Sequence, residues 1–346
     1  MNPGHPTFDL ARLQRYLADH IPGLNAQLSA RRISGGQSNP TFLLTDGRGR
    51  WVLRKKPAGE LLPSAHAVDR EYRVISALQG TSVPVARSIC LCDDPDVIGT
   101  MFYVMDFVDG RIFWDPALPE LQPKVRTMVY DEMSRVVAAL HSLRPEDVGL
   151  QDFGREGRFL ERQIGRWARQ YQASETDPIP EMHQLIGWLP EHMPPSQRHG
   201  IVHGDLRLDN MIFHPSEPRV LALLDWELST LGDPLADLGY HILPWHLTAQ
   251  QFRGMAGADL AALGIPSEQD YLAAWCTRTG SAPVDDQVWS FYLVYNLFRL
   301  AAILQGIARR AETGTATADD ARETGAKARP VAEIAWKLAK HRLGAA

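Results

Sequence analysis

The stretch from Ile201 to Glu227 constrains the chain more than any other part of its 346 residues. It contains the tripeptide His203-Gly-Asp205, then Asn210 five residues after the aspartate, and then Asp225 at the end of an apolar run. Phosphoryl transfer requires a group that orients the attacking hydroxyl, together with carboxylate and amide oxygens that hold Mg²⁺. The stretch therefore predicts a phosphoryl-transfer loop, and it predicts that another part of the chain binds a nucleotide.

Composition and charge narrow the classes of partner. The chain carries 36 Lys and Arg against 41 Asp and Glu, so its formal net charge of −5 gives no electrostatic reason to bind nucleic acid or an anionic membrane. Its three cysteines include no C-x-x-C pair, which argues against a disulfide framework and a zinc ribbon. No secretory signal and no apolar run of roughly 18 residues is apparent. We therefore expect a soluble, cytoplasmic protein whose oligomeric state the sequence does not report.

The first third of the chain predicts a β-rich region with flanking helices. Residues 8–20 have a helical spacing of apolar side chains, whereas residues 28–53 form short apolar runs separated by turn residues. The break Asp46-Gly-Arg-Gly49 between two of these runs is typical of a β-hairpin. Residues 83–91 and 100–108 add two further β-rich runs. The pattern predicts a small sheet.

A glycine-rich segment lies between the first two expected strands. In Ser34-Gly-Gly-Gln-Ser-Asn39, the glycines allow backbone N–H groups to approach phosphate oxygens without a side-chain clash. We therefore predict that Gly35, Gly36 and Ser38 cover the nucleotide phosphates. The pattern differs from the G-x-G-x-x-G of protein kinases, so an ordinary hairpin turn is the alternative.

The strand that ends in Arg54 and Lys55 supplies the expected phosphate-binding cation. Because side chains alternate along a strand, only one of these two can face the nucleotide. Comparison with the kinase sequence V-A-I-K favours Lys55, and an aliphatic-aliphatic-cation pattern favours Arg54, which we prefer. The next segment, residues 65–78, has a helical apolar face and carries Glu71, the candidate partner of that cation, with Asp69 as the alternative.

The chain changes character after the run at residues 100–108. In a kinase-like fold, backbone groups at the end of such a strand bind adenine, which places this contact at Asp106 to Val108. From Pro123 onward the chain is predicted to be mainly helical. The sequence thus predicts an α+β fold with an N-terminal nucleotide-binding lobe, residues 1–107, and a helical C-terminal lobe, residues 108–346, that carries the catalytic loop and the substrate site.

Four polar residues of the helical region lie in apolar surroundings and need partners if they are buried. Asp233, which precedes a proline, is predicted to cap a helix, and Asp237 is predicted to form hydrogen bonds with the catalytic loop. Asn296 and Arg299 interrupt the apolar segment 287–307, which predicts a buried helix. Arg299 forms either an internal structural ion pair or a binding site for an anionic group of the substrate, and Asn296, on the same side of the helix, is a further candidate for that site.

These motifs resemble those of the aminoglycoside phosphotransferase-like small-molecule kinases, in which HGD replaces the HRD of protein kinases and D-x-E or D-x-D replaces DFG. Here the motifs are His203-Gly-Asp205 with Asn210, and Asp225-Trp-Glu227. The segments SGGQSNPTFLL, VLRKKP, HAVDREYRV and LDWELSTLGDPLADL are similar to the kinase-like domain fused to certain acyl-CoA dehydrogenases, which phosphorylates hydroxyacyl groups, and to its stand-alone bacterial relatives. The resemblance covers residues 33–310 and implies a protein-kinase-like, two-lobed fold with a five-stranded first lobe.

The resemblance also implies roles for single residues. Asp205 becomes the catalytic base, with His203 holding its loop together, and Asn210 and Asp225 become the magnesium ligands. Glu227 is a further acidic residue at the metal. ATP and Mg²⁺ are the implied cofactors, and a small hydroxylated molecule is the implied partner.

The expected function is therefore the transfer of the γ-phosphoryl group of ATP to a small-molecule hydroxyl, with a hydroxyacid or hydroxyacyl-CoA as the acceptor. A site for polycationic aminoglycosides should be rich in carboxylates, whereas the segment 327–342 carries five Lys and Arg against one Glu, and Arg299 adds another cation. An antibiotic kinase of the aminoglycoside type and a catalytically silent nucleotide-binding module are the alternatives. The sequence leaves open the acceptor and the choice between ATP and GTP.

Overall fold

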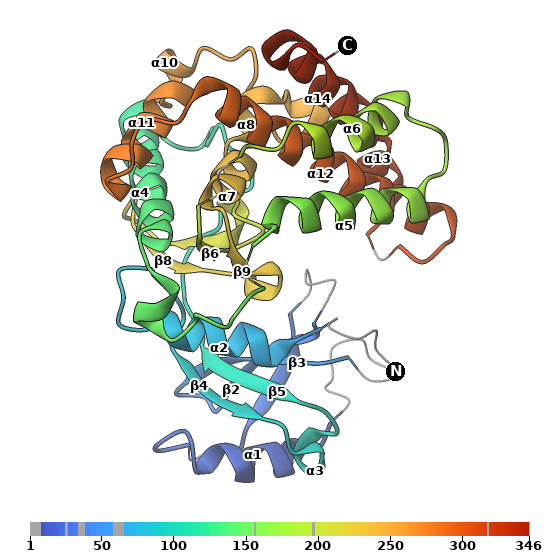
Figure 1. Ribbon diagram of the computed structural model, residues 1–346. Coiled ribbons are helices and arrows are strands. Elements are labelled where there is room, and N and C mark those ends of the chain that lie inside the picture. The colour runs from blue at the N-terminus through green and yellow to red at the C-terminus, as the bar shows by residue number, and fades with distance from the viewer. Residues whose placement is uncertain are drawn as a thin grey trace. The chain divides into compact units, whose positions relative to one another are not determined.

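The computed structural model describes residues 8–24, 27–33, 39–57, 66–155, 157–195, 198–316 and 318–345 (Figure 1). The chain divides into two compact units, one formed by Met1–Arg111 with Met211–Ser229 and the other by Ile112–Asn210 with Thr230–Ala346. The predicted lobes, 1–107 and 108–346, group residues 211–229 differently. This segment contains Asp225 and Glu227, which therefore belong to the same unit as the sheet.

The first unit is built on a five-stranded antiparallel sheet with the strand order β1-β2-β3-β5-β4. The predicted hairpin at Asp46–Gly49 is confirmed, because it joins β2 to β3. Its turn is closed by Asp46, whose Oδ1 accepts hydrogen bonds from the N–H groups of Arg48 and Gly49 at 2.9 and 2.7 Å. The strands are β1 (Ser29–Arg32), β2 (Thr41–Thr45), β3 (Arg50–Lys55), β4 (Ser88–Cys92) and β5 (Phe102–Asp106).

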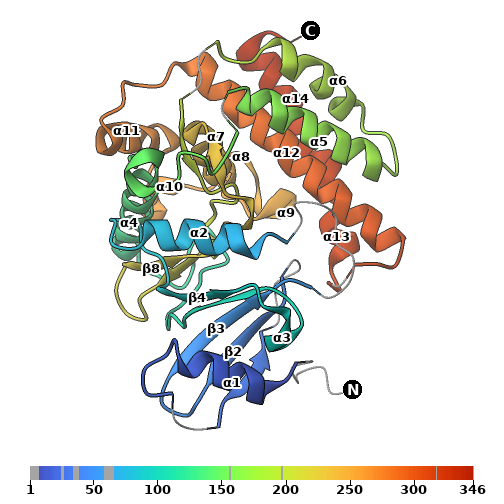
Figure 2. The same ribbon diagram turned by 60° about the horizontal axis from the view of Figure 1, so that its bottom comes forward.

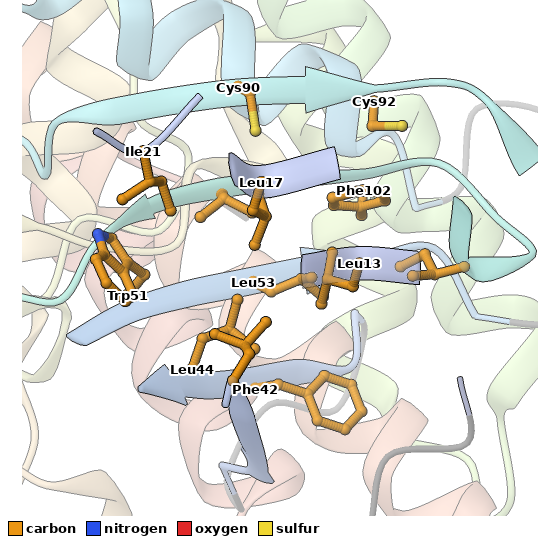
Figure 3. Close-up of a cluster of buried hydrophobic side chains, with 13 residues drawn as sticks. Leu13, Leu17, Ile21, Phe42, Leu44, Trp51, Leu53, Cys90, Cys92 and Phe102 are labelled. Atoms are coloured by element: carbon orange, nitrogen blue, oxygen red, sulfur yellow. The ribbon is translucent and has the colours of Figure 1, made fainter. Parts of the chain in front are cut away.

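One face of this sheet packs against the helix α1 (Leu10–Ala18) (Figure 3). Leu13 and Leu17 of the helix are fully buried in the same cluster as Leu44, Leu53 and Phe102 from the strands. Each such side chain contributes roughly 1.5–3 kcal/mol when it is removed from water. The cluster therefore fixes which residues of each strand face α1 and which face the other side.

The opposite face of the sheet is covered by α2 (Val68–Leu78), as Figures 1 and 2 both show. The same unit also contains α3 (Pro95–Ile98), the hairpin of β7 (Met211–Phe213) and β8 (Val220–Leu223), and the short 3-10 helix η3 (Trp226–Leu228). The backbone of Phe213 exchanges two hydrogen bonds with Arg111, at 2.9 and 2.8 Å, and Leu223 N–H donates to the carbonyl of Pro84 at 2.8 Å. These bonds attach the β7-β8 hairpin to the first unit.

The second unit is mainly helical and is organised around the long helix α12 (Asp286–Glu312) (Figure 2). This helix packs against α5 (Phe159–Ser174), α7 (Pro234–His241), α13 (Ala321–Ala326) and α14 (Ala328–Leu343). By length and composition α12 could span a membrane, but 83% of its most apolar window is buried inside the structure, as in a core helix. The helices before the catalytic loop are α4 (Pro123–His141), η1 (Pro145–Val148), α5 (Phe159–Ser174) and α6 (Pro180–Glu191). Those after it are α7 (Pro234–His241), α8 (Leu243–His246), α9 (Ala249–Phe252), α10 (Leu260–Leu263), α11 (Glu268–Thr279), α13 (Ala321–Ala326) and α14 (Ala328–Leu343).

Candidate functional site

The catalytic loop follows β6 (Gly200–Val202), which pairs with β9 (Thr230–Gly232), and it ends in the 3-10 turn η2 (Leu208–Asn210). Gly204 adopts a φ of 85°, a left-handed conformation that favours glycine. Asn210 turns back along the loop, and its Nδ2 donates to the carbonyl and the carboxylate Oδ2 of Asp205 at 2.8 and 2.9 Å. The amide therefore orients the Asp205 carboxylate.

The carboxylate of Asp237 is wholly buried and binds the backbone of the catalytic loop. It accepts hydrogen bonds from the backbone N–H groups of His203 and Gly204, the latter at 2.8 Å. His141 places Nε2 3.4 Å from the same carboxylate, while its Nδ1 accepts a hydrogen bond from the indole N–H of Trp275. Burial works to raise the pKa of Asp237, but the bond from His141 and the loop N–H groups outweigh it and lower the pKa. A charged Asp237 thus supports the loop.

Arg299 and Asn296 are buried behind the loop. The guanidinium of Arg299 donates to the carbonyl of Gly204 and lies 4.4 Å from the centroid of the Tyr240 ring. Asn296 donates from Nδ2 to the carbonyl of Ala236 at 3.0 Å. Neither side chain lines the cavity described below. The geometry favours a structural role for both residues over the alternative role in substrate binding. The predicted ion pair of Arg299 is wrong for the described residues, because its partners there are a carbonyl and two aromatic rings instead of a carboxylate.

Asp233 is the N-cap of α7 and accepts a hydrogen bond from Leu235 N–H at 2.9 Å. Its other oxygen accepts from the N–H of Arg198 at 2.8 Å and from the hydroxyl of Tyr292 at 2.7 Å. Burial raises the pKa of Asp233 despite these bonds. The residue therefore ties the helix that carries Asp237 to its surroundings.

Arg207 is a residue of the loop that contacts Asp205 and that the motif did not single out. Its Nε lies 3.1 Å from Oδ1 of Asp205, its Nη2 donates to Oδ2 at 3.2 Å, and Nη2 lies 3.4 Å from the carboxylate of Asp209. Burial opposes its charge, but Asp205 and Asp209 outweigh this and raise the pKa of Arg207. Asp205 therefore carries a permanent cationic neighbour, supplied by the same loop.

The first unit contains an ion pair between Arg54 of β3 and Glu71 of α2, with 2.9 Å between Nε and Oε2. Glu71 also accepts hydrogen bonds from the Tyr103 hydroxyl at 3.0 Å and from Asn39 Nδ2 at 2.6 Å. Burial raises the pKa of Glu71, and Arg54 opposes this shift. Tyr103 lies opposite Arg54 in the β3-β5 register, so both side chains emerge on the face that α2 covers. Tyr103 and Asn39 are positioning residues that the sequence pattern did not reveal.

Lys55 points to the opposite face of the sheet from Arg54 and is 6% exposed. Its Nζ donates to the carbonyl of Lys56 at 3.2 Å, and burial lowers its pKa. Asp69, the alternative to Glu71, is half exposed and lies 3.6 Å from the Lys56 ammonium instead. Of the four combinations left open by the sequence, the geometry supports Arg54 with Glu71.

Asp225 and Glu227 lie next to Arg54 within the first unit. The Arg54 Nη2 is 3.4 Å from Oδ1 of Asp225 and 3.8 Å from Oε2 of Glu227. Asp225 adopts a φ of 65°, which is uncommon for a residue other than glycine and is found where the surrounding structure enforces it. The side chain is held at the end of β8, with 37% of its surface exposed. This strained position is consistent with a functional carboxylate.

The donor chemistry of Asn210, Asp225 and Glu227 fits Mg²⁺, which prefers oxygen ligands and binds through one or two carboxylates together with phosphate oxygens. The Asn210 amide uses its N–H groups on Asp205, which leaves its oxygen free of those bonds. Across the described ranges, no group of three or more His, Cys, Asp and Glu could hold a metal by itself.

The structure describes only some of the other residues that the sequence predicts to contact the nucleotide. Gly35, Gly36 and Ser38 lie outside the described residues. At the end of β5, the N–H of Asp106 donates to the backbone carbonyl of Arg87 at 2.9 Å, and the N–H of Phe107 donates to the backbone carbonyl of Arg50 at 3.2 Å. Val108 is the first residue after β5 whose N–H has no partner in the part of the chain that the structure describes. It is therefore a free backbone donor within the segment that the sequence predicts to bind adenine.

A cavity of about 570 Å³, counting its open mouth, lies in the second unit beside the catalytic loop. Arg207, Leu208 and Asp209 of the loop form one part of its lining, and aromatic and aliphatic side chains form most of the rest. The lining comes from five separate stretches of the chain, so no local sequence pattern could have revealed it. It is the candidate acceptor pocket of the second unit.

The comparison with protein families agrees with this geometry. Residues 29–275 match the model of the phosphotransferase enzyme family, designated APH. The crystal structure of a Ralstonia eutropha protein assigned to the aminoglycoside phosphotransferases superposes with a TM-score of 0.88 at 49% identity, covering 96% of this chain and 98% of that one. Choline kinase from Cryptosporidium parvum, at 12% identity and a TM-score of 0.67, covers 97% of both chains and shows the kinase-like fold.

Curated relatives are similar over nearly the whole chain. Mouse acyl-CoA dehydrogenase family member 10 is 46% identical over 306 residues, which is 88% of this chain and 28% of the relative. Chicken acyl-CoA dehydrogenase family member 11 is 42% identical over 342 residues, 96% of this chain and 44% of the relative. The chain thus spans less than half the length of both relatives. Its motifs, its fold and these similarities together show that the chain belongs to the APH phosphotransferase enzyme family.

Proposed function

We propose that this phosphotransferase moves the γ-phosphoryl group of Mg·ATP to a hydroxyl of a small molecule, and that the acceptor is a hydroxyacid or a hydroxyacyl-CoA. The observation that carries the proposal is the orientation of the Asp205 carboxylate. Asn210 and Arg207 contact this carboxylate, and Asp237 binds the backbone of the same loop. Several independent bonds therefore determine the direction of a single carboxylate. That is the preorganisation expected of a group that must meet one hydroxyl.

In this proposal Asp205 orients the acceptor hydroxyl and takes its proton as the oxygen attacks the γ-phosphorus, while the bond from that phosphorus to the bridging oxygen breaks and ADP leaves. Asn210, Asp225 and Glu227 would hold Mg²⁺, which neutralises the charge that develops on the phosphate oxygens. His203 contributes through its backbone N–H, which binds Asp237, and through Nδ1, which accepts from Asp205 N–H at 3.2 Å. His203 thus shapes the loop while Asp205 contacts the substrate.

Arg54 would bind the nucleotide phosphates. Glu71 fixes its Nε, and the neighbouring Asp225 and Glu227 lie near its Nη2. Burial opposes its charge, but Tyr103, Glu71 and Asp225 outweigh this effect and raise the pKa of Arg54, so it stays cationic at every physiological pH. Gly35, Gly36 and Ser38 are proposed to cover the phosphates from above, and the backbone from Asp106 to Val108 is proposed to bind adenine.

The acceptor preference rests on the chemistry of the cavity beside the loop. Its walls are mainly apolar, and its charged lining residues are Arg207, Arg253 and Asp209. The single carboxylate already pairs with both arginines, at 3.4 and 2.8 Å. A polycation such as an aminoglycoside finds no free carboxylate there, whereas an apolar chain with a hydroxyl and a carbonyl or carboxylate suits these walls. The three buried free cysteines support a reducing, cytoplasmic location.

The proposal is tested by adding Mg·ATP to the wild type, Asp205→Ala, Asp225→Ala and the surface control Asp131→Ala. We expect Mg·ATP to stabilise the wild type, Asp205→Ala and the control, and to stabilise Asp225→Ala much less because a metal ligand is lost. Slow ATP hydrolysis should fall in both site variants and persist in the control. Unchanged hydrolysis in both site variants would reject the mechanism. A screen of hydroxyacids, hydroxyacyl-CoAs, aminoglycosides and sugars then identifies the acceptor, and turnover of aminoglycosides alone would reject the acceptor class.

A further inference from the structure

The cavity beside the catalytic loop has a buried end and an exposed end. Tyr130 and Met133 line it and are almost completely buried, whereas Trp114 and Arg253 line it and are exposed. Trp114 has 62% of its surface exposed, the largest value among the exposed large hydrophobic residues of the described chain. A large aromatic side chain left in water beside an apolar cavity indicates a surface that a ligand covers.

Arg253 connects this exposed end to the catalytic loop. Its Nη1 lies 2.8 Å from Oδ2 of Asp209, an oxygen that is also 3.4 Å from Nη2 of Arg207. Its guanidinium carbon lies 5.4 Å from the centroid of the Trp114 ring. Within the described residues, Nε and Nη2 of Arg253 form no hydrogen bond or ion pair with the protein, because its bond to Asp209 uses Nη1. The residue therefore has donors to spare for an anion.

The backbone of Arg253 is held in an unfavourable conformation. Its φ of 42° lies in the left-handed region, where a residue other than glycine is strained. The neighbouring Gly254 approaches Leu247 so closely that an added Cβ would lie 1.8 Å from the Leu247 carbonyl oxygen. Backbone bonds from Met255 N–H to Pro244 and from Ala256 N–H to Leu247, at 2.7 and 2.8 Å, fix the segment to the cavity wall. A rigid, strained segment thus holds the arginine in place.

We propose that Arg253, with Trp114 beside it, determines acceptor specificity by binding a negatively charged group of the phosphoryl acceptor at the exposed end of the cavity. Its role as an acceptor-binding residue rests on the proposed function. A carboxylate or phosphate accepts hydrogen bonds from the free Nε and Nη2 of Arg253, while Asp209 keeps Nη1 in place. The apolar part of the acceptor packs on Trp114 and on the aromatic walls. Arg207 contacts Asp205 and therefore lies near the end of the acceptor that carries the reacting hydroxyl.

Binding of two matched ligands, octanoate and methyl octanoate, tests the proposal by calorimetry on the full chain without nucleotide. The two have similar apolar chains, and only octanoate carries a charge. A charge-assisted pair at a half-exposed arginine should make octanoate bind the wild type about tenfold more tightly than the ester. Arg253→Gln should reduce this preference to less than twofold and leave the affinity for methyl octanoate unchanged. Trp114→Ala should weaken both ligands to a similar extent.

Arg158 provides the matched control. It also has a positive φ, 48°, and an exposed ion pair with Glu161 at 3.6 Å, but it does not line the cavity. Arg253→Gly and Arg158→Gly should both keep or raise the melting temperature, because glycine relieves the left-handed backbone. Only Arg253→Gly should abolish the preference for octanoate, which separates recognition from folding.

Several results would overturn the proposal. These are equal binding of the two ligands by the wild type, no binding of either at millimolar concentration, or the same loss of preference in Arg158→Gln as in Arg253→Gln. ATP hydrolysis that depends on Asp205 is measured separately, so a failed binding test leaves the phosphotransferase function standing. Conversely, the absence of any phosphoryl transfer would overturn the acceptor role of Arg253 even where the preference for octanoate is found.

Discussion

Replacement of Asp237 tests how the catalytic loop is held. Its buried carboxylate accepts hydrogen bonds from the backbone N–H groups of His203 and Gly204. Asp237→Ala removes both acceptors and leaves two buried N–H groups without partners, each costing about 1–3 kcal/mol. His141 also loses its charged partner. We therefore expect the free energy of unfolding to fall by about 3–5 kcal/mol. Asp237→Asn keeps one acceptor and should lose about half as much.

Urea denaturation at pH 7, followed by tryptophan fluorescence and circular dichroism, measures this change. Asp131→Ala is the matched control, because Asp131 is 68% exposed in its ion pair with Arg278 and should contribute at most about 1 kcal/mol. The expected order of stability is wild type and control, then Asp237→Asn, then Asp237→Ala. An Asp237→Ala protein within about 1 kcal/mol of the control would refute the idea that this carboxylate supports the loop.

Arg54→Met should lower kcat/KM for ATP by about 100-fold, because it removes the cation proposed to bind the phosphates. Lys55→Met should change kcat/KM little. Steady-state kinetics on both variants measure this, and a larger loss in Lys55→Met would contradict the assignment. Burial lowers the pKa of His241 to about 4. Between pH 6.5 and 4 the unfolded chain therefore binds a proton that the folded chain does not. The free energy of unfolding should fall by up to about 3 kcal/mol as the pH drops through this window. His241→Gln, which cannot be protonated, should show a shallower loss in urea titrations at several pH values, and an unchanged slope would count against the assignment. Gly239→Ala should destabilise the protein by about 1–3 kcal/mol, because the added Cβ would lie 2.7 Å from Asn296 Nδ2. Gly187→Ala, in a helix with open space around it, should leave the melting temperature unchanged or raise it. Equal melting temperatures for the two variants in thermal denaturation would contradict this packing.

The short-range parts of the site could be predicted from the sequence. The spacing from Asp205 to Asn210 places both on one loop, and the hydrogen bonds between them are local. The hairpin at Asp46–Gly49 likewise depends on neighbouring residues alone, since its turn is closed by an aspartate and two following N–H groups. Local chemistry of this kind leaves a clear sequence signal.

The choice between Arg54 and Lys55 could not be made from strand alternation. Trp51, Val52 and Leu53 are all buried, because α1 covers one face of the sheet and α2 covers the other. An apolar run that is buried on both sides carries no period-two signal to show which face meets Glu71. The choice depends on where the helices pack, and this is a tertiary feature.

Residues that meet across long sequence separations were also beyond prediction. Arg253 reaches Asp209, and Trp275 reaches His141, through contacts that no local pattern encodes. The same reason explains why Asp225 belongs to the first unit. The hairpin before it bonds to Arg111 and Pro84 through backbone groups, which carry no side-chain signature.

The most direct test of the account is the transfer of labelled γ-phosphoryl from Mg·ATP to a hydroxylated acceptor by Asp205→Asn. This substitution keeps the size of the side chain and the Asn210 contact but removes the base. We predict that the wild type forms the phosphorylated acceptor, that chelation of Mg²⁺ stops the reaction, and that Asp205→Asn is slower by about 10²-fold or more while it still binds nucleotide. Transfer by Asp205→Asn at the wild-type rate would contradict the central claim that this carboxylate drives the reaction.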